Sequence, residues 1–206
     1  MEKTYNQLVD ERLATESPEI FGNFSRENAK YIVPAFIKSA KQSVTILGGS
    51  MPDEFYADPN SDSSNQGMAG GESTVSDKMF VALEAAAKTL AATMKKDGEI
   101  PIRIITLDSD NNEAIDAFVK RVNQVLGKQV IKIIHARYTG RHKINHYLIV
   151  DHKRYRLEEP HRPFGGRPPE ILKAEVCCNG PLKAQMMEES FNRIWNWLLE
   201  KGRVYA

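Results

Sequence analysis

The chain has 206 residues and a formal net charge of +1, from 28 Lys and Arg against 27 Asp and Glu. Hydrophobic residues make up 41% and charged residues 27%, which is typical of an α/β globular domain that buries a core without metal or disulfide support. No apolar run approaches the roughly 20 residues of a membrane span, and the polar N-terminus is unlike a signal peptide. We therefore expect a cytoplasmic protein without whole-surface attraction to nucleic acid.

The two cysteines, Cys177 and Cys178, are adjacent. Successive side chains of a strand point to opposite faces, so this pair is poorly placed for a disulfide or a metal cage. The histidines show no zinc-finger or metalloprotease spacing. We expect no metal and no cofactor.

The N-terminal segment differs from the rest of the chain. Residues 1–20 are polar with few apolar positions, and Pro18 sets a boundary. We interpret 1–20 as an N-terminal arm, or a short helix, that docks on a partner. Residues 21–206 contain no internal repeat, and we expect them to form a single domain.

The first elements of the domain are a helix and a strand. The helix begins at Ser25, a typical N-cap, and its apolar spacing includes Pro34, which predicts a kink or an early end. A β-branched run over 43–47 predicts a buried strand. The following residues 50–74 are rich in Pro, Asp, Ser and Gly and predict a long loop.

Helices and strands then alternate. A helix begins near Ser76 and ends by Gly98, and a strand follows over 102–107. A third helix covers 113–126, and a third strand covers 130–134. This alternation predicts a largely parallel sheet with right-handed crossovers.

The last third of the chain changes pattern. Strands over 146–151 and 154–158, joined by a turn at 152–153, predict a β-hairpin. A strand over 174–178 and a helix beginning at Pro181 complete the domain. The predicted fold class is α/β, with a mixed sheet flanked by helices.

Alternation along the hairpin predicts which side chains share a face. A two-residue turn would place Leu148 and Val150 on the core face, with His146 at its far end. The opposite face would then carry the polar residues Arg154, Arg156, Glu158 and Asp151.

Positive charge is concentrated around this hairpin. Residues 137–167 hold eight Lys or Arg against three Asp or Glu, and four of the five histidines. That is a local charge of +5, so the remainder of the chain is about −4. A basic region of this kind favours a phosphate-containing ligand or nucleic acid.

Two features resemble the phospholipase D superfamily. One is the strand 148–151, Leu-Ile-Val-Asp, which ends just before a hairpin turn, and the other is the closing helix with Phe191 and Trp195. The resemblance covers residues 25–200 and implies one copy of that fold. Single-copy members pair across a dimer interface, so it also implies a homodimer.

The motif of that superfamily, His-x-Lys-x-x-x-x-Asp, is incomplete here. Aligning Asp151 with its Asp places Ile144 at the nucleophilic His and His146 at the Lys. The resemblance implies a His that attacks a phosphodiester, and Ile144 cannot do this. Either catalysis is lost or the site has been rebuilt from other groups.

The candidates for a rebuilt site lie within a short stretch. Histidine serves as nucleophile or general acid near neutral pH, a carboxylate orients it, and arginine binds phosphate through paired donors. The catalytic candidates are His146, Glu158 and His161, and the phosphate-binding candidates are Arg154, Arg156 and Asp151.

Structural roles compete with these interpretations. Asp151 and Arg154 also suit an ion pair that closes the turn. His146 also suits a hydrogen-bonded core position. Arg156 and Glu158 also suit a surface pair of little energetic value.

Three functions fit these features. The first is a phosphate- or nucleic-acid-binding module that keeps the fold without catalysis. The second is an accessory or effector subunit of a larger bacterial assembly, docked through the arm and the loop 50–74. The third is an atypical phosphodiesterase, a nuclease rather than a lipase, built on His146, Arg156, Glu158 and His161.

Overall fold

The computed structural model describes residues 3–48, 75–94, 98–107, 113–139, 144–159, 173–202 and 204–205. The helices within these residues are α1 (Tyr5–Ala14), α2 (Arg26–Lys38), α3 (Val75–Thr93), α4 (Glu113–Leu126) and α5 (Pro181–Lys201). The strands are β1 (Ile20–Asn23), β2 (Val44–Gly48), β3 (Ile102–Thr106), β4 (Ile131–His135), β5 (Arg137–Tyr138), β6 (Tyr147–Val150), β7 (Arg154–Glu158), β8 (Ala174–Cys177) and β9 (Val204–Tyr205).

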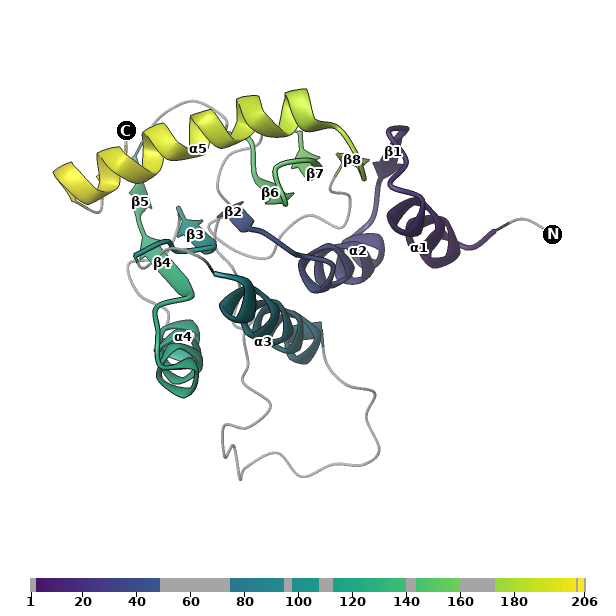
Figure 1. The fold of residues 1–206 in the computed structure, drawn as a ribbon. Helices are drawn as coiled ribbons and strands as arrows, with labels where there is room; N and C mark the ends of the chain where they lie inside the picture. The colour runs from purple at the N-terminus through teal and green to yellow at the C-terminus, as the bar shows by residue number, and fades with distance from the viewer. Residues whose placement is uncertain are drawn as a thin grey trace, which may run out of the picture.

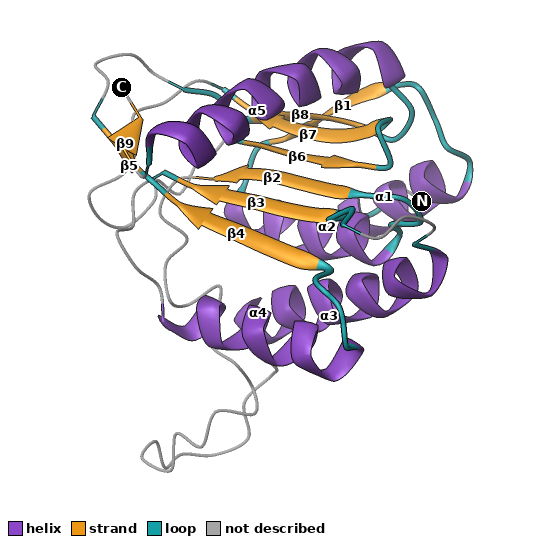
Figure 2. Ribbon diagram, turned by 60° about the vertical axis from the view of Figure 1, so that its left-hand side comes forward, coloured by secondary structure: helices purple, strands orange, loops and turns teal. Residues whose placement is uncertain are grey.

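The main sheet has the strand order β1-β8-β7-β6-β2-β3-β4, and β5 pairs with β9 in a separate small sheet. Strands β2, β3 and β4 are parallel, whereas β6, β7, β8 and β1 continue the sheet in antiparallel fashion. Helix α5 crosses one face, and α1 to α4 cover the other (Figures 1 and 2). The predicted mixed sheet flanked by helices is confirmed.

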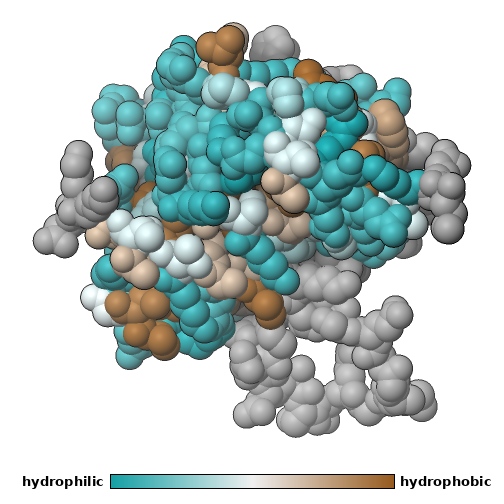
Figure 3. Space-filling view, turned by 45° about the vertical axis from the view of Figure 1, so that its right-hand side comes forward, coloured by the Kyte–Doolittle hydropathy of each residue, from teal (hydrophilic) through white to brown (hydrophobic). Residues whose placement is uncertain are grey.

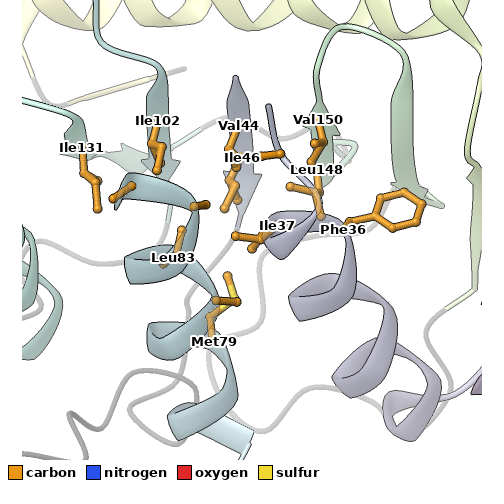
Figure 4. Packing of buried hydrophobic residues seen from close by; sticks show 14 of the residues in the cluster. Phe36, Ile37, Val44, Ile46, Met79, Leu83, Ile102, Ile131, Leu148 and Val150 are labelled. Atoms are coloured by element: carbon orange, nitrogen blue, oxygen red, sulfur yellow. The ribbon is translucent and has the colours of Figure 1, made fainter. Parts of the chain in front are cut away.

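Both faces of the sheet are buried, and each has its own core. Between the sheet and helices α1 to α4, strand residues such as Ile46, Ile102 and Leu148 meet Phe36 and Leu83 (Figure 4). The opposite core lies under α5, where Phe191 and Trp195 pack against β6 and β7 residues. A sheet covered on both faces has strands that are apolar throughout, and every residue of β2 is buried.

The start predicted for the helix after Ser25, which is α2 in the structure, is correct. Ser25 has extended backbone angles, and its hydroxyl accepts a hydrogen bond from the Asn28 amide at 3.1 Å. The helix continues beyond Pro34 as far as Lys38, so the proline does not end it early. The predicted loop over 50–74 lies outside the described residues.

The segment predicted to be a docking arm is packed on the domain. Thr4 and Gln7 form a capping box at the start of α1, and Val9 is fully buried in the core. Glu16, just after the helix, forms ion pairs with Lys153 and Arg154 of the hairpin. The chain then enters the sheet as the edge strand β1, which the sequence pattern did not predict.

The hairpin is present, but its register differs from the expected one. Its loop contains three residues, 151–153, so that Val150 pairs with Arg154 and Leu148 with Arg156. One additional loop residue turns every side chain of the second strand to the other face of the sheet. The expectation that Arg154 and Arg156 point to the other face of the sheet from Leu148 and Val150 is therefore wrong. The two arginines share the face of these core residues, and both are buried.

The outer surface is largely hydrophilic on the face that Figure 3 shows, with small hydrophobic patches. Helix α5 buries Phe191 and Trp195 but leaves Leu182 and Met186 exposed. Trp197 of the same helix is 37% exposed. Among the helices that the structure describes, none has both the length and the apolar character that crossing a bilayer requires.

Replacing the buried residue of α1 tests whether this segment belongs to the core. Val9→Ala is expected to lower the free energy of unfolding by about 1.5–3 kcal/mol, because it removes buried methyl groups and leaves a void. Asn6→Ala, at an exposed position of the same helix, is the control. Urea denaturation followed by circular dichroism gives both values, and equal stability of the two variants would show that α1 is undocked.

Candidate functional site

Polar side chains from most strands gather along one side of the main sheet, where the strands end or begin. We call this line of strand ends an edge of the sheet, as distinct from an edge strand such as β1. Strands β2, β3, β4, β7 and β1 end at this edge, and β6 and β8 begin there. The pairing registers align one residue of each strand in a transverse line that we call the edge row. In sheet order the edge row is Asn23, Ala174, Glu158, His146, Gly48, Thr106 and His135.

The edge row faces the layer of helices α1 to α4. Side chains along a strand alternate between the two faces, so residues two positions apart share a face. Ile104 lies two positions from Thr106, and Leu148 lies two positions from His146. Both belong to the core beneath helices α1 to α4. The two smallest members, Gly48 and Ala174, separate the polar ones into groups. With strands about 4.8 Å apart, the edge row spans roughly 29 Å.

The central group consists of His146 and Glu158 of the edge row together with Arg156, which lies next to them on the same face. His146 Nδ1 lies 3.6 Å from Glu158 Oε2, and both side chains are largely buried. Arg156, two residues before Glu158 on the same face of β7, donates through Nη1 to Glu158 Oε1. Its Nε donates to Asn23 Oδ1 at 2.9 Å. Three of the predicted site residues are therefore brought together.

Arg156 carries donor capacity that its neighbours do not use. The residue is 5% exposed, and its Nη2 atom is buried without a hydrogen-bond partner among the described residues. A buried guanidinium nitrogen without an acceptor is unfavourable by itself. Tyr5 of α1 lies near the same group, and burial raises the pKa of its phenol to about 12, so it stays protonated at neutral pH.

A second group of the edge row was not predicted from the sequence. His135 Nδ1 lies 2.8 Å from Thr106 Oγ1, and His135 Nε2 lies 3.0 Å from Asp116 Oδ1 at the start of α4. His135 is 5% exposed. The signal was available, since polar residues that end neighbouring parallel strands meet at one edge. The pattern predicts a strand over 130–134, which stops short of His135, whereas β4 includes this residue.

The layout of the helices makes this edge favourable for anions. Helix α2 starts just after β1 ends there, and α3 and α4 run antiparallel to the strands that they connect. The N-terminal ends of these helices therefore lie towards the edge row. Partial positive charge at helix N-termini stabilises a bound anion.

A hollow borders one member of the central group, Glu158. It has a volume of about 440 Å³ and lies next to the end of β1 and β7. Its lining includes Phe24, Asn145, Glu158, Glu159 and Lys173. Phe24 is 62% exposed, so an aromatic face is available close to Glu158.

Asp151 and Arg154, the other predicted phosphate ligands, lie at the other ends of the same strands, on the side of the sheet away from the edge row. Asp151 accepts hydrogen bonds from the backbone amides of Lys41, Gln42 and Ser43, at distances of 2.7–3.1 Å. Arg154 donates to Asp151 at 2.8 Å and to Glu16 at 3.1 Å. The carboxylate is therefore occupied by structural contacts, and the arginine is neutralised by two acidic partners.

The basic region is largely paired where the structure describes it. Lys153 and Arg154 form ion pairs with Glu16, and Arg156 forms one with Glu158. His161 and four of the other basic residues lie outside the described residues. The exposed anion-binding face inferred from the local charge of +5 is therefore not visible along the hairpin.

Position 144, where the resemblance places the nucleophile, has an apolar role. Ile144 is partly buried and packs against the core beneath α5, whereas His146 belongs to the edge row on the other face. No group of three or more metal-ligating side chains occurs in the described part of the chain.

Comparison with solved structures identifies the fold. The chain is similar to Nuc from Salmonella typhimurium, a phospholipase D family member, with a TM-score of 0.53, 18% identity, and coverage of 86% of this chain and 94% of that one. It is also similar to NucT from Helicobacter pylori, with a TM-score of 0.50, 11% identity, and coverage of 86% and 97%. The phospholipase D-like fold predicted from the sequence is thereby confirmed.

A third similar structure is TrmBL2, an archaeal chromatin protein that binds DNA. Its TM-score is 0.52 at 7% identity, and the match covers 92% of this chain but 58% of TrmBL2. No family model and no curated protein matches the sequence itself. Because one fold supports many activities, these likenesses establish the architecture and leave the function to the site.

Replacing Asp151 tests its structural role. Asp151→Asn is expected to lower the free energy of unfolding by about 3 kcal/mol, because it leaves the buried Arg154 charge less compensated and turns an amide group towards backbone donors. Glu159→Gln, an exposed change of the same type, is the control. A urea-unfolding stability within error of the wild type would refute this role.

Proposed function

We propose that the domain binds phosphate groups of nucleic acid at the central group of the edge row. The observation that carries this proposal is the buried Arg156 guanidinium, whose Nη2 atom lacks an acceptor among the described residues, beside the His146 and Glu158 pair. A phosphate oxygen would supply the missing acceptor, and a charge-assisted hydrogen bond is stronger than a neutral one.

Three further features support a nucleic-acid ligand. Helix N-termini are directed towards the same edge, which favours an anion. The exposed ring of Phe24 lies beside the hollow next to Glu158, where an unstacked base has an aromatic surface to contact. Proteins of similar fold include TrmBL2, which binds DNA.

Binding without catalysis agrees best with the altered motif. Ile144 stands at the nucleophile position and packs in an apolar core, so it provides no attacking atom. A homodimer and an accessory or effector role in a larger assembly are proposed with it, on the resemblance and the exposed apolar residues of α5.

One observation favours the alternative, an atypical phosphodiesterase. His146 lies within 3.6 Å of Glu158, an arrangement in which a carboxylate orients an imidazole for nucleophilic or general-acid work. In this alternative His146 attacks phosphorus and forms an N–P bond, the P–O bond to one ester group breaks, and that group leaves as an alkoxide that takes up a proton from water. Glu158 orients the ring, and Arg156 stabilises the charge that develops on the phosphate oxygens. His161, the remaining catalytic candidate, stays a prediction of the sequence.

Two arginines of β7 provide a matched test of binding. Both are buried on one face of the same strand, but Arg156 belongs to the central group and Arg154 to the opposite edge. Arg156→Lys is expected to weaken binding of a fluorescein-labelled single-stranded oligonucleotide roughly 10-fold or more, because the forked donor is lost. Arg154→Lys should leave affinity unchanged in protein that circular dichroism shows to be folded.

Fluorescence anisotropy at 50 and 200 mM salt measures this affinity. Binding that weakens with salt and with the Arg156 change supports the proposal. Absence of wild-type binding at both salt concentrations, or equal losses in the two variants, overturns it.

Turnover separates the alternative from simple binding. The phosphodiesterase predicts that wild-type protein releases p-nitrophenol from bis(p-nitrophenyl) phosphate and that His146→Asn abolishes release, because an asparagine side chain cannot act as the nucleophile. The binding module predicts no release by either protein while oligonucleotide affinity persists. Absorbance at 400 nm is the readout.

A further inference from the structure

A second cluster of chemically competent side chains lies at the edge of the sheet opposite the edge row. Ser43 precedes β2, His152 lies in the loop between β6 and β7, and Glu188 lies on α5. His152 Nδ1 is 2.5 Å from Glu188 Oε2, and His152 Nε2 is 3.3 Å from Ser43 Oγ. The three residues form a hydroxyl–imidazole–carboxylate relay.

The order of atoms in the relay is that of an activated serine. A carboxylate only accepts hydrogen bonds, so Nδ1 of His152 carries the hydrogen towards Glu188. A neutral ring then leaves Nε2 as the acceptor for the Ser43 hydroxyl. A nucleophile bonded to a base that a third group orients is the arrangement of covalent catalysis, and such hydrogen bonds are often long before substrate binds.

The supporting residues hold the relay in place. Arg103 of β3 donates to Glu188 Oε1 at 3.4 Å and to Asn192 Oδ1 at 2.7 Å, so both carboxylate oxygens of Glu188 are engaged. The Ser43 backbone donates to Asp151 at 3.1 Å and accepts from the Asp151 amide at 3.0 Å. The serine is therefore fixed by its backbone rather than by its hydroxyl.

The backbone of the loop between β6 and β7 has an unusual conformation at His152, the residue that would act as the base. Asp151 and His152 have φ values of 53° and 58°, a region that few residues other than glycine adopt. This conformation directs His152 between Ser43 and Glu188. The His152 side chain is 52% exposed and that of Glu188 is 13% exposed, so the base meets solvent while its orienting carboxylate is shielded.

We propose that Ser43, His152 and Glu188 form a nucleophilic site that reacts with small activated esters, with Ser43 as nucleophile, His152 as base and Glu188 as the orienting group. The amides of Lys41, Gln42 and Ser43 already bond Asp151, so they are not available as an oxyanion hole. We therefore confine the substrate class to acyl and phosphoryl compounds with good leaving groups and exclude amides.

The reaction with a phosphorofluoridate illustrates the chemistry. Ser43 Oγ attacks phosphorus, the O–P bond forms, and the P–F bond breaks as fluoride leaves. The hydroxyl proton passes to His152 Nε2 and then to water. With an aryl ester, Oγ forms an acyl bond and the phenol leaves, taking its proton from His152, and water then hydrolyses the acyl-serine.

Labelling with diisopropyl fluorophosphate tests the proposal on the full-length protein. Mass spectrometry of intact protein and of peptides is expected to locate one adduct on Ser43. His152→Ala should slow its formation roughly 100-fold, the size of a general-base contribution. Ser39, four residues earlier, donates its hydroxyl to the Phe36 carbonyl and has no imidazole partner among the described residues, so it is the internal control serine.

The pH dependence distinguishes an orienting role of Glu188 from a purely structural one. The hydrogen bond from His152 to Glu188 raises the His152 pKa above 6.5, and Asp151 and Arg103 act on the same ring with opposite signs. Labelling should therefore rise with pH through a midpoint above 6.5. Glu188→Gln should move this midpoint to lower pH and reduce the plateau rate, with folding verified by circular dichroism.

The outcomes are decisive in either direction. Adduct formation on Ser43 that is lost in 6 M urea and in His152→Ala establishes the site. Modification of Ser43 no faster than that of Ser39, or a rate unchanged by His152→Ala in folded protein, overturns it and leaves the cluster as a tether between the hairpin and α5.

Discussion

The architecture depends on one buried carboxylate. Asp151 accepts hydrogen bonds from three successive backbone amides between α2 and β2 and from Arg154 on the far side of its own loop. Arg154 in turn bonds Glu16 at the end of the N-terminal segment. Three parts of the chain that are remote in sequence therefore converge on a single charge. That charge tolerates burial because each of its oxygens is hydrogen-bonded.

The two edges of the sheet have different chemical characters as a result. At the Asp151 edge, buried charges are matched and the backbone donors are satisfied within the fold. At the edge row, carboxyl ends of parallel strands, helix N-termini and a guanidinium with unused donor capacity are brought together. Ligands of open α/β sheets bind outside the carboxyl ends of the strands, where side chains of neighbouring strands converge. A phosphate site at the edge row therefore agrees with the general behaviour of such sheets.

Periodicity in the sequence was enough to predict most helices and the strands of the main sheet other than β1, whereas the phospholipase D-like fold was implied by the resemblance of strand 148–151 and the closing helix to that superfamily. Details that depend on one residue were not predictable in this way. The hairpin loop has three residues because Asp151 is drawn towards the amides near Ser43, a partner more than 100 positions away, and this reversed the faces of Arg154 and Arg156. Asn23 and Thr106 became site neighbours only through strand pairing. Of the predicted site, His146, Glu158 and Arg156 came together because all three face one side of adjacent strands.

The position of β1 bears on how the chain acquires its structure during synthesis. Its register aligns Ile20 with Cys177 of β8, and the Lys153 ammonium bonds Glu16 across 137 residues of sequence. Contacts between such distant segments form late, because most of the intervening chain must first be ordered. Strand β1 therefore has no partner strand until β8, more than 150 residues later in the sequence, has been made. The parallel β2–β4 unit and its helices are complete well before that, so this unit is the natural nucleus onto which the first strand later closes.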